Sequence, residues 1–210
     1  MKTMKQVVVA VSLLVISAMA PVVEAQQGVN KAAPGTLVAP AEALNSLLNI
    51  TESQMTSLVK AFPADKYGFA PSAAIFAPGQ QTEFAGVRTF GALVIHVAQA
   101  NYFLGSRLSG LKPDIDPTTL AKLSSKDEIV AALEASFAFD HKAIGTLTNA
   151  TAFESVSDRT PGGAIIPSTR CTQAAYIAVH AFDEYGQMVE YLRMNGITPP
   201  SSGAPAPPKK

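Results

Sequence analysis

Two residues near the carboxyl-terminal end of the chain have side chains and a spacing that suit metal binding. His180 and Glu184 lie four residues apart in a segment, 169–194, whose apolar residues recur at intervals of three and four. This periodicity predicts a helix, and residues four apart on a helix project from the same side, one turn apart. On a helical wheel, the apolar residues of this segment form an arc, and both residues lie just beyond its edge. This predicts that they lie in a groove between helices. An imidazole and a carboxylate placed in this way can bind one divalent ion, but a transition-metal site needs three or four donors.

A third donor must therefore come from elsewhere in the fold, and His96 is the candidate. It lies in another segment with helical periodicity, 89–108, on or beside the apolar stripe. The pattern also fits ordinary structural roles, because a histidine and a glutamate at this spacing often form a surface pair. A histidine on an apolar face is, in the same way, often a hydrogen-bonded core residue. Asp140 and His141 in the next predicted helix are reserve ligands, and His141 is expected to be exposed to solvent.

Four stripes of apolar residues predict the elements that must position these side chains. No stretch shows a convincing strand alternation. The chain is therefore expected to be all-α, a four-helix bundle with long connections between helices one and two, two and three, and three and four. The connection 109–123 is long enough to cross the bundle, and the loop 63–88 is a candidate cover for one end of the site. The predicted helices span residues 40–62, 89–108, from 124 or 125 to about 147, and 169–194.

The two ends of the chain differ in composition from the helical region. Residues 1–25 start with lysines, continue in an apolar run and end in small residues, which is the layout of a secretory signal peptide cleaved after Ala25. An uncleaved N-terminal anchor is the alternative. Residues 26–39 are expected to form a flexible lead-in, residues 40–200 the domain, and residues 201–210 a disordered proline-rich tail. We expect export to the periplasm or the extracellular space, without stable membrane insertion after cleavage.

Charge and cysteine content narrow the range of partners. The 210-residue chain holds 16 basic and 16 acidic residues, and loss of residues 1–25 leaves 14 and 15. A near-neutral chain lacks the basic face that a nucleic-acid partner requires. Cys171 is the one cysteine in the sequence, so no intramolecular disulfide can form. A small buried apolar role is expected for Cys171, and a reactive thiol at a helix start is the alternative.

Two segments resemble the signatures of the DinB-like (damage-inducible-like) four-helix family. Residues 86–98, Gly-Val-Arg-Thr-Phe-Gly-Ala-Leu-Val-Ile-His-Val-Ala, are similar to its second-helix signature, which has a histidine near the middle. Residues 180–187, His-Ala-Phe-Asp-Glu-Tyr-Gly-Gln, resemble its fourth-helix signature, usually His-x-x-x-His followed by one residue and Gly-Gln. Residues 191–197 continue the match. The resemblance covers about residues 40–200, with both motifs in the order that the family has.

The resemblance implies a metal triad from the second and fourth helices, often occupied by zinc or nickel in family members. His96 matches the first ligand and His180 the second, while Glu184 stands where a third histidine is usual. The carboxylate makes the site harder and more anionic than three imidazoles would. Two imidazoles and a carboxylate can hold Zn²⁺ with an open position or Fe²⁺ with several, and manganese also accepts such donors.

Further side chains are candidates for orienting a ligand beside this triad. Gln187 and Tyr191 follow Glu184 at further turn spacings on the same flank. They either orient bound water or substrate or pack at a helix crossing. Tyr102, on the second predicted helix, is a candidate pocket wall.

Three kinds of function fit these features. The first is an exported enzyme that uses a divalent ion for hydrolysis. Some relatives resemble thiol-dependent transferases, but export separates this chain from cytosolic thiols. The second is a non-enzymatic protein that binds a metal or a small ligand, and the third is a bundle whose metal site has decayed through the change at Glu184. The expected partner is a small molecule of unknown identity, and the family resemblance also allows a homodimer.

Overall fold

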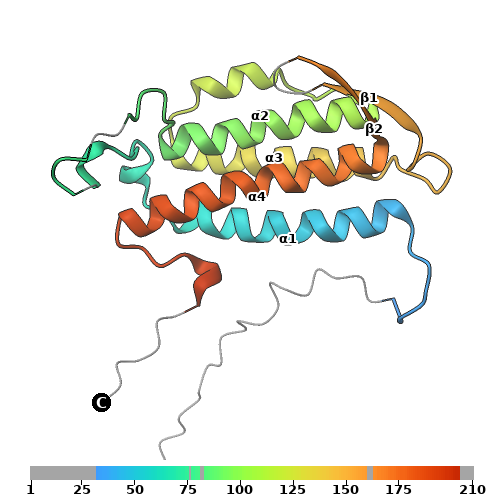
Figure 1. Ribbon diagram of the computed structural model, residues 1–210, viewed down its shortest axis with the longest axis horizontal. Helices are drawn as coiled ribbons and strands as arrows, with labels where there is room; N and C mark the ends of the chain where they lie inside the picture. Colours follow the sequence, from blue (N-terminus) through green and yellow to red (C-terminus); the bar gives the residue numbers. More distant parts are fainter. Residues whose placement is uncertain (1–31, 76, 81–82, 160–162, 204–210) are drawn as a thin grey trace, which may run out of the picture.

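The computed structural model describes residues 32–203, apart from residues 76, 81–82 and 160–162. Four long helices pack side by side in this range, and we call them the bundle (Figure 1). The all-α prediction is confirmed. The segment interpreted as a signal peptide lies outside the described residues, and no described helix combines the length and apolar character needed to cross a membrane. The helices are α1 (Pro40–Ala61), α2 (Phe90–Ser109), α3 (Lys126–Ile144) and α4 (Arg170–Met194).

Side-chain caps explain where three of the helices begin. Thr89, Ser125 and Thr169 precede α2, α3 and α4, and each side chain accepts a hydrogen bond from a backbone N–H in the first turn. Ser125 and Glu128 form a reciprocal capping box. At the other end of α2, Gly110 adopts a φ of 75°, which glycine reaches without the strain that a Cβ would bring. These local signals explain the starts of α2, α3 and α4 and the end of α2, which lie close to the predicted positions. The third helix was predicted to end near residue 147, but α3 ends at Ile144.

The helices do not follow one another around the core in chain order. α2 packs against α3 and α4, and α1 packs against the same two helices, so α1 and α2 lie diagonally opposite each other. α2 and α3 run parallel, because Asn101 of α2 bonds Ser136 of α3 and, one turn further along both helices, Gly105 faces Asp140. The chain must therefore return along the bundle between them. The connection that contains η4 (Pro117–Lys122), which packs on α2, makes this return.

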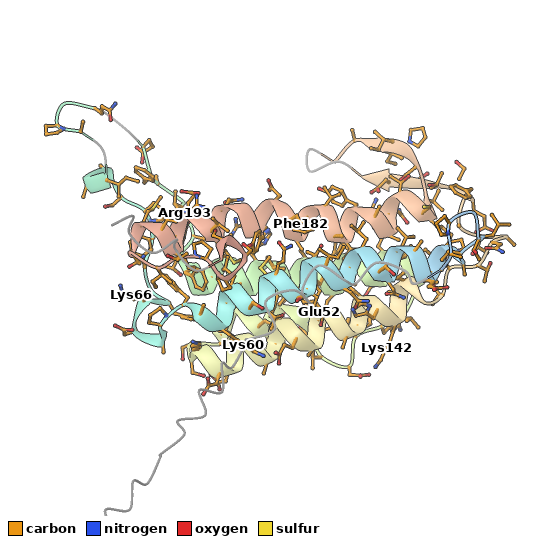
Figure 2. The ribbon with its side chains drawn as sticks, turned by 90° about the horizontal axis from the view of Figure 1, so that it is seen from below. Glu52, Lys60, Lys66, Lys142, Phe182 and Arg193 are labelled. Carbon is orange, nitrogen blue, oxygen red and sulfur yellow. The ribbon has the colours of Figure 1, made fainter. Side chains whose placement is uncertain are left out.

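A short hairpin in the connection between α3 and α4 was not predicted. Strands β1 (Ser155–Arg159) and β2 (Ile165–Thr169) pair antiparallel, with Ser155 opposite Thr169. The expectation of a chain without strands is wrong for this segment. Figures 1 and 2 place the hairpin by the amino-terminal end of α4, while the loop before α2 lies at the opposite end of the bundle.

The first residues of the predicted tail belong to a short helix. A short 3₁₀ helix, η5 (Pro200–Ser202), packs against α1, and the Tyr185 hydroxyl shares a hydrogen bond with Ser201. The rest of the tail lies outside the described residues apart from Gly203.

The close approach of α2 to α3 depends on Gly105. A Cβ at this position would lie 2.5 Å from Oδ1 of Asp140 and 3.0 Å from the Phe139 ring. We therefore expect Gly105→Ala to lower the free energy of unfolding by about 1–3 kcal/mol, the usual cost of overpacking. Gly186→Ala on α4 is the matched control, because a Cβ there meets nothing within 4 Å and helix propensity favours alanine by about 1 kcal/mol. Urea unfolding of both variants checks this, and equal effects would contradict the close contact.

Candidate metal centre

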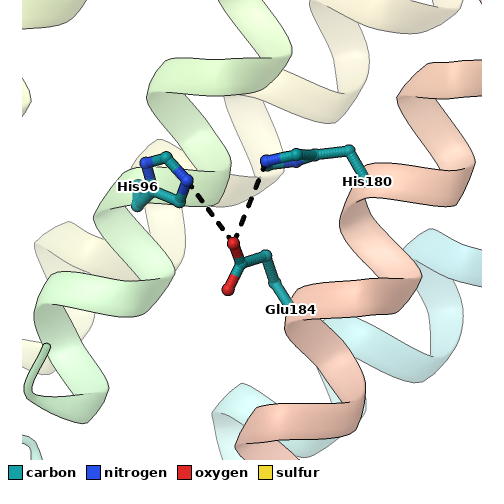
Figure 3. A group of neighbouring side chains, drawn as sticks. All are labelled: His96, His180 and Glu184. Atoms are coloured by element: carbon teal, nitrogen blue, oxygen red, sulfur yellow. Dashed lines mark ion pairs between the residues drawn. The ribbon is translucent and has the colours of Figure 1, made fainter. Parts of the chain in front are cut away.

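The side chains of His96, His180 and Glu184 converge between α2 and α4 (Figure 3). Nε2 of His96 lies 3.4 Å from Oε1 of Glu184, and Nε2 of His180 lies 3.9 Å from the same oxygen. One donor atom from each residue can be chosen so that all three lie within 4.8 Å of one another. The structure therefore brings together the three residues that the sequence singled out.

These separations can be compared with the geometry of a shared metal ion. Donors bonded to one Zn²⁺ at about 2.1 Å with tetrahedral angles are about 3.4 Å apart. The distance from His96 to Glu184 equals this spacing, and the distance from His180 to Glu184 exceeds it by about 0.5 Å. Both nitrogen–oxygen distances are long for a direct hydrogen bond. The three side chains thus surround a point instead of bonding one another, which fits a divalent ion.

The antiparallel arrangement of α2 and α4 produces this convergence. The hydroxyl of Tyr191, near the end of α4, donates a 3.0 Å hydrogen bond to the carbonyl of Arg88, just before α2. The ring of Phe69 packs edge-on against Tyr191 at 5.8 Å. These contacts fasten the loop 63–88 to α4 and set the register in which His96 meets His180 and Glu184. Tyr191 therefore has a structural role at a helix crossing.

Burial sets the protonation states of the two imidazoles. Burial lowers the pKa of His96, and the positive charge of Arg88 lowers it further. Burial also lowers the pKa of His180, although the Glu184 carboxylate opposes this effect. Both rings are therefore neutral at neutral pH, which is the state that binds a metal.

Glu184 is more deeply buried than its place on the helical wheel predicted. It is 6% exposed, and burial raises the pKa of its carboxyl group, against a smaller lowering by His180. A buried carboxylate needs a compensating charge. Gln187 donates a 3.1 Å hydrogen bond to Oε2, which leaves Oε1 facing the two histidines. Gln187 thus orients the carboxylate, one of the two roles predicted for it.

Ring packing orients His180. Its Nδ1 atom is buried and has no hydrogen-bond partner among the described residues. The ring lies 5.4 Å from that of His96 and 6.3 Å from that of Tyr176, one turn earlier on α4. The hydrogen bond that usually orients a metal-binding imidazole is thus replaced here by aromatic contacts.

The other candidates lie away from the cluster. Tyr102 is buried against Phe139, with ring centroids 5.3 Å apart, on the side of α2 that faces α3. Asp140 is fully buried in the same interface. The predicted exposure of His141 is wrong, because its ring is partly buried and bridges α3 to α1. Nδ1 of His141 lies 2.7 Å from Asn45 Oδ1, and Nε2 lies 2.9 Å from Glu52 Oε2.

Two further residues lie at the amino-terminal ends of α4 and α2. Cys171 is half-buried at the start of α4, so the fully buried position expected for it is not what the structure shows. Arg88 was not identified from the sequence, yet its charge acts on His96, His180 and Glu184. Its place two residues before the first residue of α2, inside the segment that resembles the family signature, was the available signal.

Comparison with known proteins does not add to this description. No model of a protein family matches the chain, and no curated protein matches it either. The functional argument therefore depends on the residues and their geometry.

Proposed function

We propose that this chain is an exported DinB-like protein that holds a divalent metal ion between His96, His180 and Glu184. The observation that carries the proposal is the convergence of three metal-binding donors from two antiparallel helices, at spacings close to those of donors that share one ion. The residues that converge belong to the two segments, 86–98 and 180–187, that resemble the family signatures. This supports the proposed family membership as well.

The proposed activity is hydrolysis of a small molecule. A divalent ion with three protein donors keeps positions open and would supply Lewis acidity to a carbonyl, phosphoryl or water oxygen. The protein's own residues would bind and orient. His96 and His180 would donate neutral nitrogen lone pairs, and Glu184 would supply negative charge through Oε1. Gln187 holds the second oxygen of Glu184 and so fixes the direction of the first.

A non-enzymatic role in metal or ligand binding is the alternative, and one observation favours it. Oε2 of Glu184 accepts the hydrogen bond from Gln187, while Oε1 faces the two histidines. Both oxygens of Glu184 thus have a positioning role, one toward the histidines and one toward Gln187, and a hydrolase would need a general base from elsewhere. The metal-ligand cluster found in the described part of the chain holds no other carboxylate.

Metal content is the decisive measurement. We expect the chain without residues 1–25, purified without a histidine tag, to bind about one equivalent of Zn²⁺. At a free concentration near 100 times the dissociation constant, binding stabilises the folded state by about 2.7 kcal/mol. This corresponds to a rise in melting temperature of about 5–10 °C for a chain of this size. Elemental analysis and thermal melts with Zn²⁺, Ni²⁺, Mn²⁺ and Fe²⁺ measure both effects.

Variants at position 184 test the unusual ligand. Glu184→Ala should lose the metal, whereas Glu184→His should keep it, because a histidine four residues after His180 projects toward the same point. A chain that contains no metal and shows no shift with any of the four ions would contradict the proposal. If metal binds, a screen of ester, amide and phosphoester substrates separates the hydrolase from the binding protein. Turnover that persists in metal-free Glu184→Ala would count against hydrolysis at this site.

A further inference from the structure

A large cavity lies next to the metal centre, between α2, α4 and the hairpin. Its volume is about 870 Å³, and residues of all three elements form its wall. We call it the hairpin groove. Cavities of about 300–1,000 Å³ with mostly apolar walls are typical of small-molecule sites, and the space between the helices of a bundle is a common place for them.

The wall of the hairpin groove carries large apolar side chains that the fold leaves uncovered. Phe103 is 64% exposed, Tyr176 is 46% exposed and Ile166 is 44% exposed. Such side chains gathered around one cavity lose contact with water when an apolar ligand enters. The polar part of the wall includes an ion pair between Arg107 of α2 and Asp158 of β1. This pair ties the hairpin to α2 and balances its own charge, which favours an uncharged apolar occupant.

Two residues of the groove wall lie near the metal centre along the two helices. On α4, Tyr176 lines the groove and its ring also lies 6.3 Å from that of His180, four residues later. On α2, Phe103 follows His96 by seven residues, which places both on one face about 10 Å apart along the axis. The two helices are antiparallel. The residues that follow His96 on α2 and those that precede His180 on α4 therefore both lie toward the hairpin.

We propose that the hairpin groove binds the apolar part of a small molecule whose polar end lies at His96, His180 and Glu184. The ligand class is an uncharged alkyl or aryl chain that ends in an oxygen donor, such as a carboxylic ester or amide. The position of the polar end rests on the proposed metal site, whereas binding of the apolar part does not. The two ideas can therefore fail separately.

The first experiment tests the groove without any metal. N-phenyl-1-naphthylamine, a neutral apolar dye, should bind the metal-free chain with enhanced fluorescence. Phe103→Ser should weaken dye binding at least tenfold. Phe153→Ser is the matched control, because Phe153 is exposed but does not line the groove. Equal binding by the Phe103→Ser variant and the wild-type chain would overturn the proposal, as would a wild-type chain that does not bind the dye.

The second experiment tests continuity with the metal centre. Straight-chain hydroxamates from acetohydroxamate to decanohydroxamate are titrated into the Zn²⁺-loaded chain. Once the tail is long enough to pass Tyr176, each further methylene should tighten binding about three- to fourfold, the value expected for a buried methylene. Phe103→Ser should reduce this gain, whereas Phe153→Ser should leave it unchanged. No dependence on tail length would overturn the proposed continuity.

Two other results distinguish the remaining explanations. If Zn²⁺ does not bind but the dye does, the proposed metal function fails, and the groove stands as a binding site for apolar molecules. If a second copy of the chain covers the groove, sedimentation will show a dimer that Phe103→Ser dissociates, and the dye will not bind the wild-type chain. That result would overturn the small-molecule proposal.

Discussion

Zn²⁺ is expected to leave the melting temperature of a His180→Ala variant almost unchanged. The substitution removes one of three donors, and His96 and Glu184 alone provide too few ligands for a stable site. Loss of a residue that only hydrogen-bonds a metal ligand lowers metal affinity about 10–100-fold. Loss of a ligand itself should therefore lower the affinity for Zn²⁺ at least about 100-fold. At the Zn²⁺ concentration that stabilises the wild-type chain by about 2.7 kcal/mol, the variant would then gain only about 0.4 kcal/mol.

His141→Ala is the control for this experiment. It makes the same substitution at another partly buried histidine, whose ring bridges α3 to α1 through Asn45 and Glu52. This variant is expected to melt at a lower temperature than the wild-type chain and still show the full Zn²⁺-induced rise. Elemental analysis of the purified variants gives an independent measure of occupancy. Full occupancy in His180→Ala, or loss of occupancy in His141→Ala, would contradict the ligand assignment.

The helices could be predicted because their signals are local. The apolar spacing and the caps at Thr89, Ser125 and Thr169 each involve residues within a few positions of one another, and the helices begin where these caps indicate. The pairing of His180 with Glu184 is local in the same sense. The approach of His96 depends on the register between α2 and α4, and periodicity carries no information about that register. His96 was therefore only a candidate on its helical pattern, and the resemblance to a family is what implied that it meets His180 and Glu184.

The hairpin shows where local signals fail. β2 contains Pro167, and its first three residues are exposed, so it has no alternation of buried and exposed side chains. β1, Ser-Val-Ser-Asp-Arg, is mostly polar. Backbone pairing and the contact of Arg107 with Asp158 hold this ribbon in place, without the buried face by which strands are usually predicted. The hairpin groove could not be predicted either, because its wall comes from three elements that are distant in the sequence.

Asp140 carries the second large expected effect, on stability. It is 0% exposed in the interface between α2 and α3, and neither carboxyl oxygen has a hydrogen-bond partner among the described residues. Burial raises its pKa well above the ordinary value for an aspartate. The folded state therefore favours the protonated form, because an isolated buried charge is costly.

This shift makes stability depend on pH in a definite direction. Above the ordinary aspartate pKa of about 3.9, the unfolded chain has lost this proton while the folded chain still holds it. Folding then requires proton uptake, so the contribution of Asp140 to stability falls as pH rises, until the folded-state pKa is reached. The slope in this window approaches about 1.4 kcal/mol per pH unit. Removing the charge should remove the slope.

Asp140→Asn is therefore expected to become progressively more stable than the wild-type chain as pH rises from 5 toward 8. Urea unfolding of both chains in EDTA at several pH values measures the difference, in which the titration of His96, His180 and Glu184 cancels. Asp65→Asn, at an exposed carboxylate, is the matched control for the substitution itself. Parallel stability curves for the wild-type chain and Asp140→Asn would mean that Asp140 is ionised in the folded state, with its charge compensated by a group that enters the α2/α3 interface.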